Sequence, residues 1–97
     1  MGVYVLLSNL TDEGARTLSE NPDRIKAVNR EVEELGAKVL AQYALLGRYD
    51  FLNIVEAPDD ETIARLSIAL ASRGTLRIET LTAIPIDRFA KRLGARA

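Results

Sequence analysis

The spacing of apolar residues divides the chain into strands and helices. Residues 3–8 (VYVLLS) and 51–57 (FLNIVEA) are apolar at nearly every position, which is typical of central strands buried on both faces. Residues 37–46 (AKVLAQYALL) and 75–84 (TLRIETLTAI) alternate between apolar and polar side chains, which indicates edge strands. The pattern therefore predicts four strands, two in the middle of a sheet and two at its edges.

The segment between the first two strands predicts a helix in two parts. Thr11 is placed to cap a first helical turn through its hydroxyl. Asn21 and Pro22 then restart the helix, with Asn21 as the N-cap and Pro22 at the first helical position, and Gly36 ends it. An apolar stripe at helical spacing lies between these start and stop signals: Ile25, Val28, Val32 and Leu35.

Two further helices are predicted after the third and fourth strands. The first begins at Pro58 and Asp59, where the acidic run DDE lies at the positive end of the helix dipole, and Gly74 closes it. Its buried stripe is Ile63, Leu66 and Leu70. A short helix near the end of the chain carries a second apolar stripe, formed by Ile86, Phe89, Ala90 and Leu93.

This element order, βαββαβ with a short C-terminal helix, predicts one α+β domain over residues 1–97. It is the order of the ferredoxin-like fold, in which a four-stranded antiparallel sheet of order 4-1-3-2 carries two helices on one face. Strands one and three lie in the middle of such a sheet. Topology and apolar pattern therefore agree.

The first strand has apolar side chains on both of its faces. Val3, Val5 and Leu7 point to one side of the sheet, while Tyr4 and Leu6 point to the other. Two helices cover only one face, and a large uncovered apolar face is unusual in a soluble monomer. We therefore expect self-association into a homodimer or a higher homo-oligomer, with two sheets packed face to face as a dimeric α/β barrel.

Three segments in the same order resemble the GYD-domain family of small bacterial and archaeal proteins: NLTDEGARTLSENPDRI, LGRYDFLNIVEAPDDE and GTLRIETLTAIP. The glycine, tyrosine and aspartate of the family motif match Gly47, Tyr49 and Asp50, with Arg48 inserted after the glycine. The resemblance covers nearly the whole chain and implies a fold of the dimeric α/β-barrel type. It implies no particular reaction, cofactor or catalytic set.

The stretch GRYD, residues 47–50, has a structural and a functional interpretation. In the first, Gly47 supplies a positive φ, Asp50 bonds nearby backbone amides, and Tyr49 packs at the sheet edge. In the second, the Tyr49 hydroxyl and the Asp50 carboxylate bind a polar ligand at the mouth of the barrel or exchange a proton with it. The residue types that a short turn requires favour the structural interpretation.

A second set of polar residues lies on the predicted strands. Lys38 and Gln42 would share one face of the second strand, and Arg77 and Glu79 one face of the fourth. If these faces turn away from the helices, the side chains line the space between two sheets, where they would bind a small molecule. A solvated edge or cross-strand ion pairs are the alternative. Asn53, in a central strand, needs a hydrogen-bond partner. The candidate ligand-binding residues are Tyr49, Asp50, Gln42, Asn53, Arg77 and Glu79.

Composition narrows the possible chemistry. The chain has no cysteine and no histidine, and its 13 basic and 14 acidic residues give a net charge of −1. No thiol nucleophile or zinc-finger spacing is available, and the acidic run APDDE is interpreted as helix capping rather than as a metal site. No cofactor, nucleic acid or membrane partner is expected, although the C-terminal helix has a basic face. With no apolar run long enough to span a bilayer, the expected location is cytoplasmic.

Two classes of function remain open. The favoured one is an oligomeric α/β-barrel protein without catalysis, which binds a small molecule or has a regulatory or structural role. The alternative is a cofactor-independent enzyme resembling monooxygenases or isomerases with the same fold, and it rests on fold alone. The absence of histidine, the usual general base at neutral pH, counts against the alternative.

Overall fold

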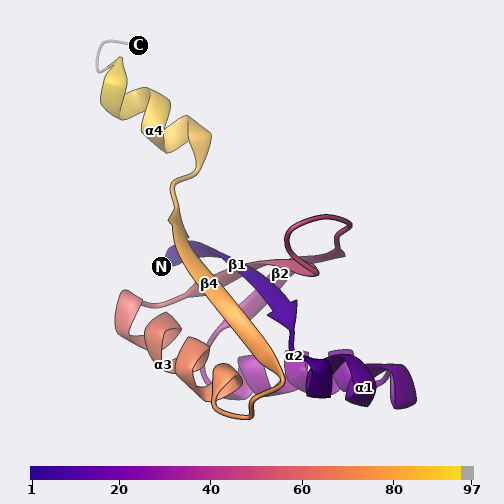
Figure 1. The fold of residues 1–97 in the computed structure, drawn as a ribbon. Coiled ribbons are helices and arrows are strands. Elements are labelled where there is room, and N and C mark those ends of the chain that lie inside the picture. Colours follow the sequence, from indigo (N-terminus) through magenta and orange to yellow (C-terminus); the bar gives the residue numbers. More distant parts are fainter. Residues whose placement is uncertain (95–97) are drawn as a thin grey trace.

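The computed structural model describes residues 1–94, so the last three residues of the predicted domain lie outside the described part. In chain order its elements are β1 (Gly2–Leu10), α1 (Asp12–Glu20), α2 (Arg24–Glu34), β2 (Lys38–Ala44), β3 (Phe51–Ala57), α3 (Asp60–Ala71), β4 (Leu76–Ala83) and α4 (Ile86–Leu93). The predicted α+β order with a short C-terminal helix is confirmed (Figure 1).

The four strands form one antiparallel sheet in the order β2-β3-β1-β4, which is the predicted order counted from the other edge. β1 pairs with β3 from Gly2 opposite Ala57 to Ser8 opposite Phe51. On its other side β1 pairs with β4 over eight residues, which ends with Leu10 opposite Leu76. The predicted barrel of two such sheets requires a second chain and stays a prediction.

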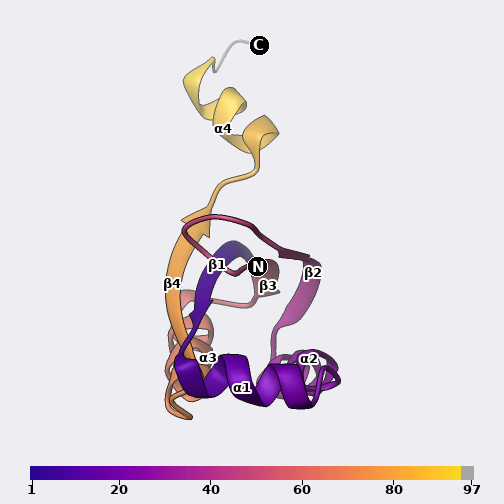
Figure 2. The same ribbon diagram turned by 45° about the vertical axis from the view of Figure 1, so that its right-hand side comes forward.

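Helices α1, α2 and α3 all lie on one face of this sheet (Figures 1 and 2). Strand residues whose side chains point toward these helices supply four of the nine buried apolar residues, and α2 and α3 supply another four. The predicted stripe of α3 is buried as expected. The buried apolar residues are Tyr4, Leu6, Val32, Ala37, Val55, Ala57, Ile63, Leu66 and Leu70.

The break between α1 and α2 differs from the prediction. Asn21 ends α1, because its backbone N–H donates to the Thr17 carbonyl oxygen, and it does not cap α2. Helix α2 begins only at Arg24, after Asp23. The local signal of Asn21 before Pro22 is compatible with a turn as well as with a helix start. Here the continuing hydrogen bonds of α1 decide between the two.

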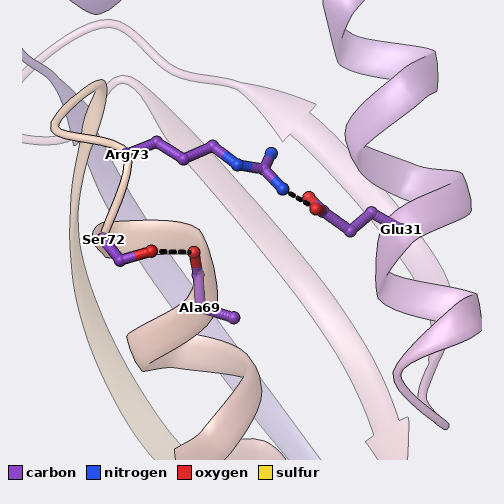
Figure 3. A network of polar contacts seen from close by, with 4 residues as sticks. All are labelled: Glu31, Ala69, Ser72 and Arg73. Atoms are coloured by element: carbon purple, nitrogen blue, oxygen red, sulfur yellow. Dashed lines mark hydrogen bonds and ion pairs between the residues drawn. The ribbon is translucent and has the colours of Figure 1, made fainter.

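Local contacts fix the ends of the helices and link α2 to the end of α3. The Thr11 hydroxyl accepts the Gly14 N–H at 3.1 Å, as predicted for a capping residue. Gly14 lies so close to the chain before β4 that a Cβ atom would come 2.0 Å from the Thr75 carbonyl oxygen. On the far side, Arg73 after α3 forms an ion pair with Glu31 of α2, and the Ser72 hydroxyl donates to the Ala69 carbonyl (Figure 3).

Helix α4 projects away from the sheet and from the other helices beyond the end of β4 (Figures 1 and 2). All residues of Ile86–Leu93 are exposed. The Cα radius of gyration is 15.0 Å, whereas a compact chain of this length has about 12.5 Å. Helix α4 therefore contributes no buried residue to the described part of the molecule.

Candidate functional site

The GRYD stretch lies in the loop between β2 and β3, which arches from β2 toward β4 (Figure 2). Gly47 has a φ of 131°, a conformation that a side chain would strain. The Leu45 N–H donates to the Asp50 carbonyl oxygen at 2.8 Å and closes the loop at its base. The positive φ expected at Gly47 is confirmed.

Asp50 connects this loop to the end of β1. Its carboxylate accepts the Leu10 N–H at 2.9 Å, and its own N–H donates to the Ser8 carbonyl oxygen at 2.9 Å. The carboxylate and the N–H of Asp50 therefore both bind backbone groups that are 40 residues or more away in sequence. These contacts are of the kind that the structural interpretation requires, and they leave the carboxylate with a backbone partner.

Tyr49 reaches the opposite edge strand of the sheet. Its hydroxyl donates a hydrogen bond to the Glu79 carboxylate of β4. This hydrogen bond, together with partial desolvation, raises the pKa of the Tyr49 phenol above its usual value. The protonated phenol holds the loop on β4 through this hydrogen bond.

The sheet face opposite the helices carries an apolar centre with a charged rim. The register places Val5 between Ile54 of β3 and Leu81 of β4, and the next row places Leu7 beside Leu52. Charged residues flank this centre on both edge strands. The rim consists of Lys38 beside Glu56 and of Arg77 with Glu79.

This open face remains accessible to solvent within one chain. Leu81 is 41% exposed and Tyr43, on the β2 side, is 57% exposed. Apolar centres surrounded by polar rims are typical of surfaces that bind other proteins. On α4, Phe89 is 42% exposed as well.

The polar candidates of the sequence do not all lie on this face. Arg77 and Glu79 share the open face of β4, as expected. On β2, however, the pairing skips Leu40, so that Val39 lies opposite Val55 and Ala41 opposite Ile54. The prediction that Lys38 and Gln42 share a face is therefore wrong, because the extra residue of this β-bulge reverses the alternation.

The bulge divides the predicted set of ligand-binding residues between the two faces of the sheet. Gln42 lies opposite Asn53, which points toward the helices. Both side chains line a cavity between the sheet, α1 and α2. The structure thus brings Gln42 and Asn53 together on the covered side and brings Tyr49 and Glu79 together on the open side. Whether either pair binds a ligand stays a prediction.

The sequence analysis missed two structural features, a hydrogen bond and a β-bulge. The hydroxyl of buried Tyr4 donates to Asp60 at the start of α3, and this hydrogen bond raises the Tyr4 pKa to about 12. The second is the bulge itself, whose signal is Leu40, an apolar residue between Lys38 and Gln42 where alternation calls for a polar one. A single apolar residue in a polar series is a weak signal without the paired strand.

The glycine, tyrosine and aspartate of the β2–β3 loop also identify the family. The model of the GYD domain matches residues 4–93, which is nearly the whole described chain. The chain belongs to the GYD-domain family. In this GYD-domain protein the motif residues Gly47, Tyr49 and Asp50 form the loop on the open side of the sheet.

Known proteins resemble this GYD-domain protein in sequence and in structure. It is 53% identical over 94 residues to the "Glutamine synthetase and cystathionine beta-lyase binding protein" of Thermus thermophilus, and the match covers 96% of this chain and 99% of that protein. The crystal structure of TTHA0845 from the same organism has a TM-score of 0.58 and 23% identity, and covers 88% of this chain and 95% of that one. The latter likeness shows the fold alone.

Within residues 1–94 no three acidic side chains gather as a metal site requires, and none of the described helices is long and apolar enough to cross a membrane. Tyr49 and Asp50, the polar side chains of the motif, are held by Glu79 and by the Leu10 backbone. What the surface offers is apolar area with a charged rim.

Proposed function

We propose that this chain is a non-catalytic binding protein that associates with itself and with partner enzymes through its open sheet face and α4. The observation that carries the proposal is the accessible apolar centre of the open face with its charged rim. Burial of such a centre stabilises an assembly by roughly 25 cal/mol for each Å² of apolar surface removed from water. The charges of the rim then select the partner and its orientation.

The partners follow from the relative at 53% identity, which is named for binding glutamine synthetase and cystathionine beta-lyase. The alignment covers almost all of both chains, so the relative has the same set of secondary-structure elements available for contact. We propose that this chain binds enzymes of the same two kinds. The regulatory role considered from the sequence would then act on a partner's activity.

Self-association is the second part of the proposal. Helix α4 has an apolar stripe, Ile86, Phe89 and Leu93, whose side chains are 74%, 42% and 74% exposed. A second copy supplies an apolar surface of the right kind in its open face, and the two-fold related contact is then made twice. A sheet-to-sheet dimer with exchanged C-terminal helices would cover both surfaces.

Matched charge substitutions test the surface. Leu81→Lys places a lysine in the open face, and Ile68→Lys places one at an apolar residue on α3 that is 72% exposed and outside the proposed surface. Light scattering of the wild-type protein is expected to give at least twice the chain mass of 10.7 kDa. Leu81→Lys is expected to lower this mass, and Ile68→Lys is expected to leave it unchanged.

The same variants test the partners. Biolayer interferometry against immobilised glutamine synthetase and cystathionine beta-lyase is expected to show binding by the wild type and by Ile68→Lys. Leu81→Lys is expected to bind at least tenfold more weakly, because an interface centre does not readily desolvate an ammonium group. A monomeric wild type would contradict the proposed self-association. Wild-type protein that binds neither enzyme would contradict the proposed partners.

A further inference from the structure

The bulge in β2 turns a polar side chain into the covered side of the sheet. In a regular strand Gln42 would lie on the same face as Lys38, which is exposed. The bulge instead places Gln42 opposite Asn53, so that two amide side chains are neighbours across adjacent strands. Directly opposed residues have Cβ atoms about 5 Å apart. Bulges of this kind are frequent next to binding sites, where they re-aim a side chain.

A cavity of about 80 Å³ lies at this amide pair, between the sheet, α1 and α2. Its walls are mostly apolar, and buried Ser8 is among the lining residues. Arg24, the first residue of α2, is the only ionisable residue among those that line it. The apolar lining residues are Leu10, Leu18, Ile25, Val28, Phe51 and Leu76.

The two amides that line this cavity each have one group available for a further hydrogen bond. The Asn53 Oδ1 atom is buried and accepts no hydrogen bond from the protein. The Gln42 Oε1 atom accepts from Asn29 Nδ2 at 2.9 Å, which fixes that amide and leaves its Nε2 group to donate elsewhere. An unpaired buried acceptor costs stability, and nothing in the packing of β3 requires a polar side chain at this position. A ligand that donates an N–H would complement the Asn53 Oδ1 acceptor.

We propose that this cavity binds a small neutral or anionic molecule that carries a carboxamide on a short apolar body. The amide N–H of the ligand donates to Asn53 Oδ1, and its carbonyl oxygen accepts from Gln42 Nε2. The apolar walls hold the carbon atoms. Arg24 disfavours a cationic ligand, since a second positive charge beside the guanidinium is repelled.

The volume sets the size of the buried part of the ligand. A dry cavity of about 150 Å³ holds benzene, so one of about 80 Å³ takes roughly three to five heavy atoms. A carboxamide with one or two attached carbons has that size. Any larger part of the ligand extends toward solvent past α1 and α2.

The test is an NMR titration of the full chain with isobutyramide, whose carboxamide and central carbon fit the cavity and whose methyl groups extend toward its opening. We expect shifts confined to the cavity, with the side-chain NH2 groups of Gln42 and Asn53 and the Ser8 amide among the largest. The neutral ketone 3-methyl-2-butanone has the same shape but no N–H. It is expected to bind at least tenfold more weakly, because it leaves the Asn53 acceptor unpaired.

Substitutions separate a binding site from a gap in the packing. Asn53→Leu is expected to weaken isobutyramide binding at least tenfold while it raises the melting temperature, because it removes the unpaired acceptor. Gln42→Met removes the donor from an edge strand and is also expected to weaken binding at least tenfold. The matched control is Asn9→Leu, the same change on the open face of β1, which is expected to bind isobutyramide like the wild type.

Three results would overturn the proposal. The first is the absence of confined shifts at any soluble concentration of isobutyramide, which means a cavity that holds only water. The second is equal affinity for the amide and the ketone, which removes the role of Asn53. The third is equal weakening by Asn53→Leu and Asn9→Leu. None of these results depends on self-association or on partner enzymes, so this proposal and the proposed function fail independently.

Discussion

The two faces of the sheet carry similar side chains in different surroundings. On β1, Tyr4 and Leu6 point toward the helices and are 3% and 2% exposed, while Val3 and Val5 on the other face are only partly buried. Burial under the helices makes the covered face the core of a single chain. The open face is apolar like the core, but no helix covers it. The difference indicates that the covered face stabilises the single chain, whereas the open face is available for association with another chain.

The sharpest test of this difference is a pair of leucine truncations. Leu66→Ala on the covered side removes a fully buried side chain and is expected to lower the free energy of unfolding by about 2–5 kcal/mol. Leu81→Ala on the open face is expected to cost less than about 1 kcal/mol at concentrations where the chain is monomeric. Urea denaturation measures both losses, and equal losses would contradict the assignment.

Asp50 connects the two sides, because it joins the loop on the open side to the end of β1. Asp50→Ala leaves the Leu10 N–H without its partner, so we expect a loss of about 1–3 kcal/mol. Thermal unfolding measures the loss as a lower melting temperature. Tyr49→Phe, which keeps the ring and loses only the hydroxyl bond to Glu79, is the milder control. An unchanged melting temperature in Asp50→Ala would favour the functional interpretation of GRYD.

Alkaline pH tests the hydrogen bond between Tyr4 and Asp60 on the covered side. The Asp60 hydrogen bond raises the Tyr4 pKa from 10.0 to about 12 in the folded protein. Its contribution to stability is therefore complete below pH 10 and is lost as the pH rises toward 12, because only the unfolded chain loses the proton in that range. The stability of the wild type is expected to fall more steeply between pH 10 and 12 than that of Tyr4→Phe. Parallel curves from urea denaturation would show that the hydrogen bond does not form.

The smallest effect is expected at the ion pair between Arg73 and Glu31 (Figure 3). Both side chains are partly exposed, and such pairs contribute about 0–1 kcal/mol. Arg73→Ala is expected to lower the free energy of unfolding within that range, and the difference from wild type should shrink in high salt. A loss as large as that of Leu66→Ala would mean that helix-to-helix contacts, rather than burial on the sheet, hold the covered side together.

Much of the fold could be predicted because local pattern and global topology agree. The apolar strands 3–8 and 51–57 lie in the middle of the sheet, and the stripe Ile63, Leu66 and Leu70 is the buried stripe of α3. These are consequences of period-two and period-3.6 spacing, which the chain carries within each element. The glycine at the β2–β3 loop was likewise visible as a turn residue with positive φ.

The site was less predictable because it depends on pairing between strands. Alternation along β2 assigned Lys38 and Gln42 to one face, and only the partner strand reveals the extra residue between Val39 and Ala41. The partners of Tyr49 and Asp50 are 30 and 40 residues away in sequence. Spacing within one segment carries no information about such contacts. The sequence therefore predicts the residue types of a site more readily than their grouping.

A strand with a bulge responds to insertions and deletions differently from a regular strand. Because the pairing already skips Leu40, a chain without this residue would keep Val39 opposite Val55 and Ala41 opposite Ile54. Removal of a residue beyond the bulge, such as Tyr43, would instead move the residues that follow it to the other face. The length of β2 can therefore change by one residue at the position of Leu40 while the same side chains stay on each face.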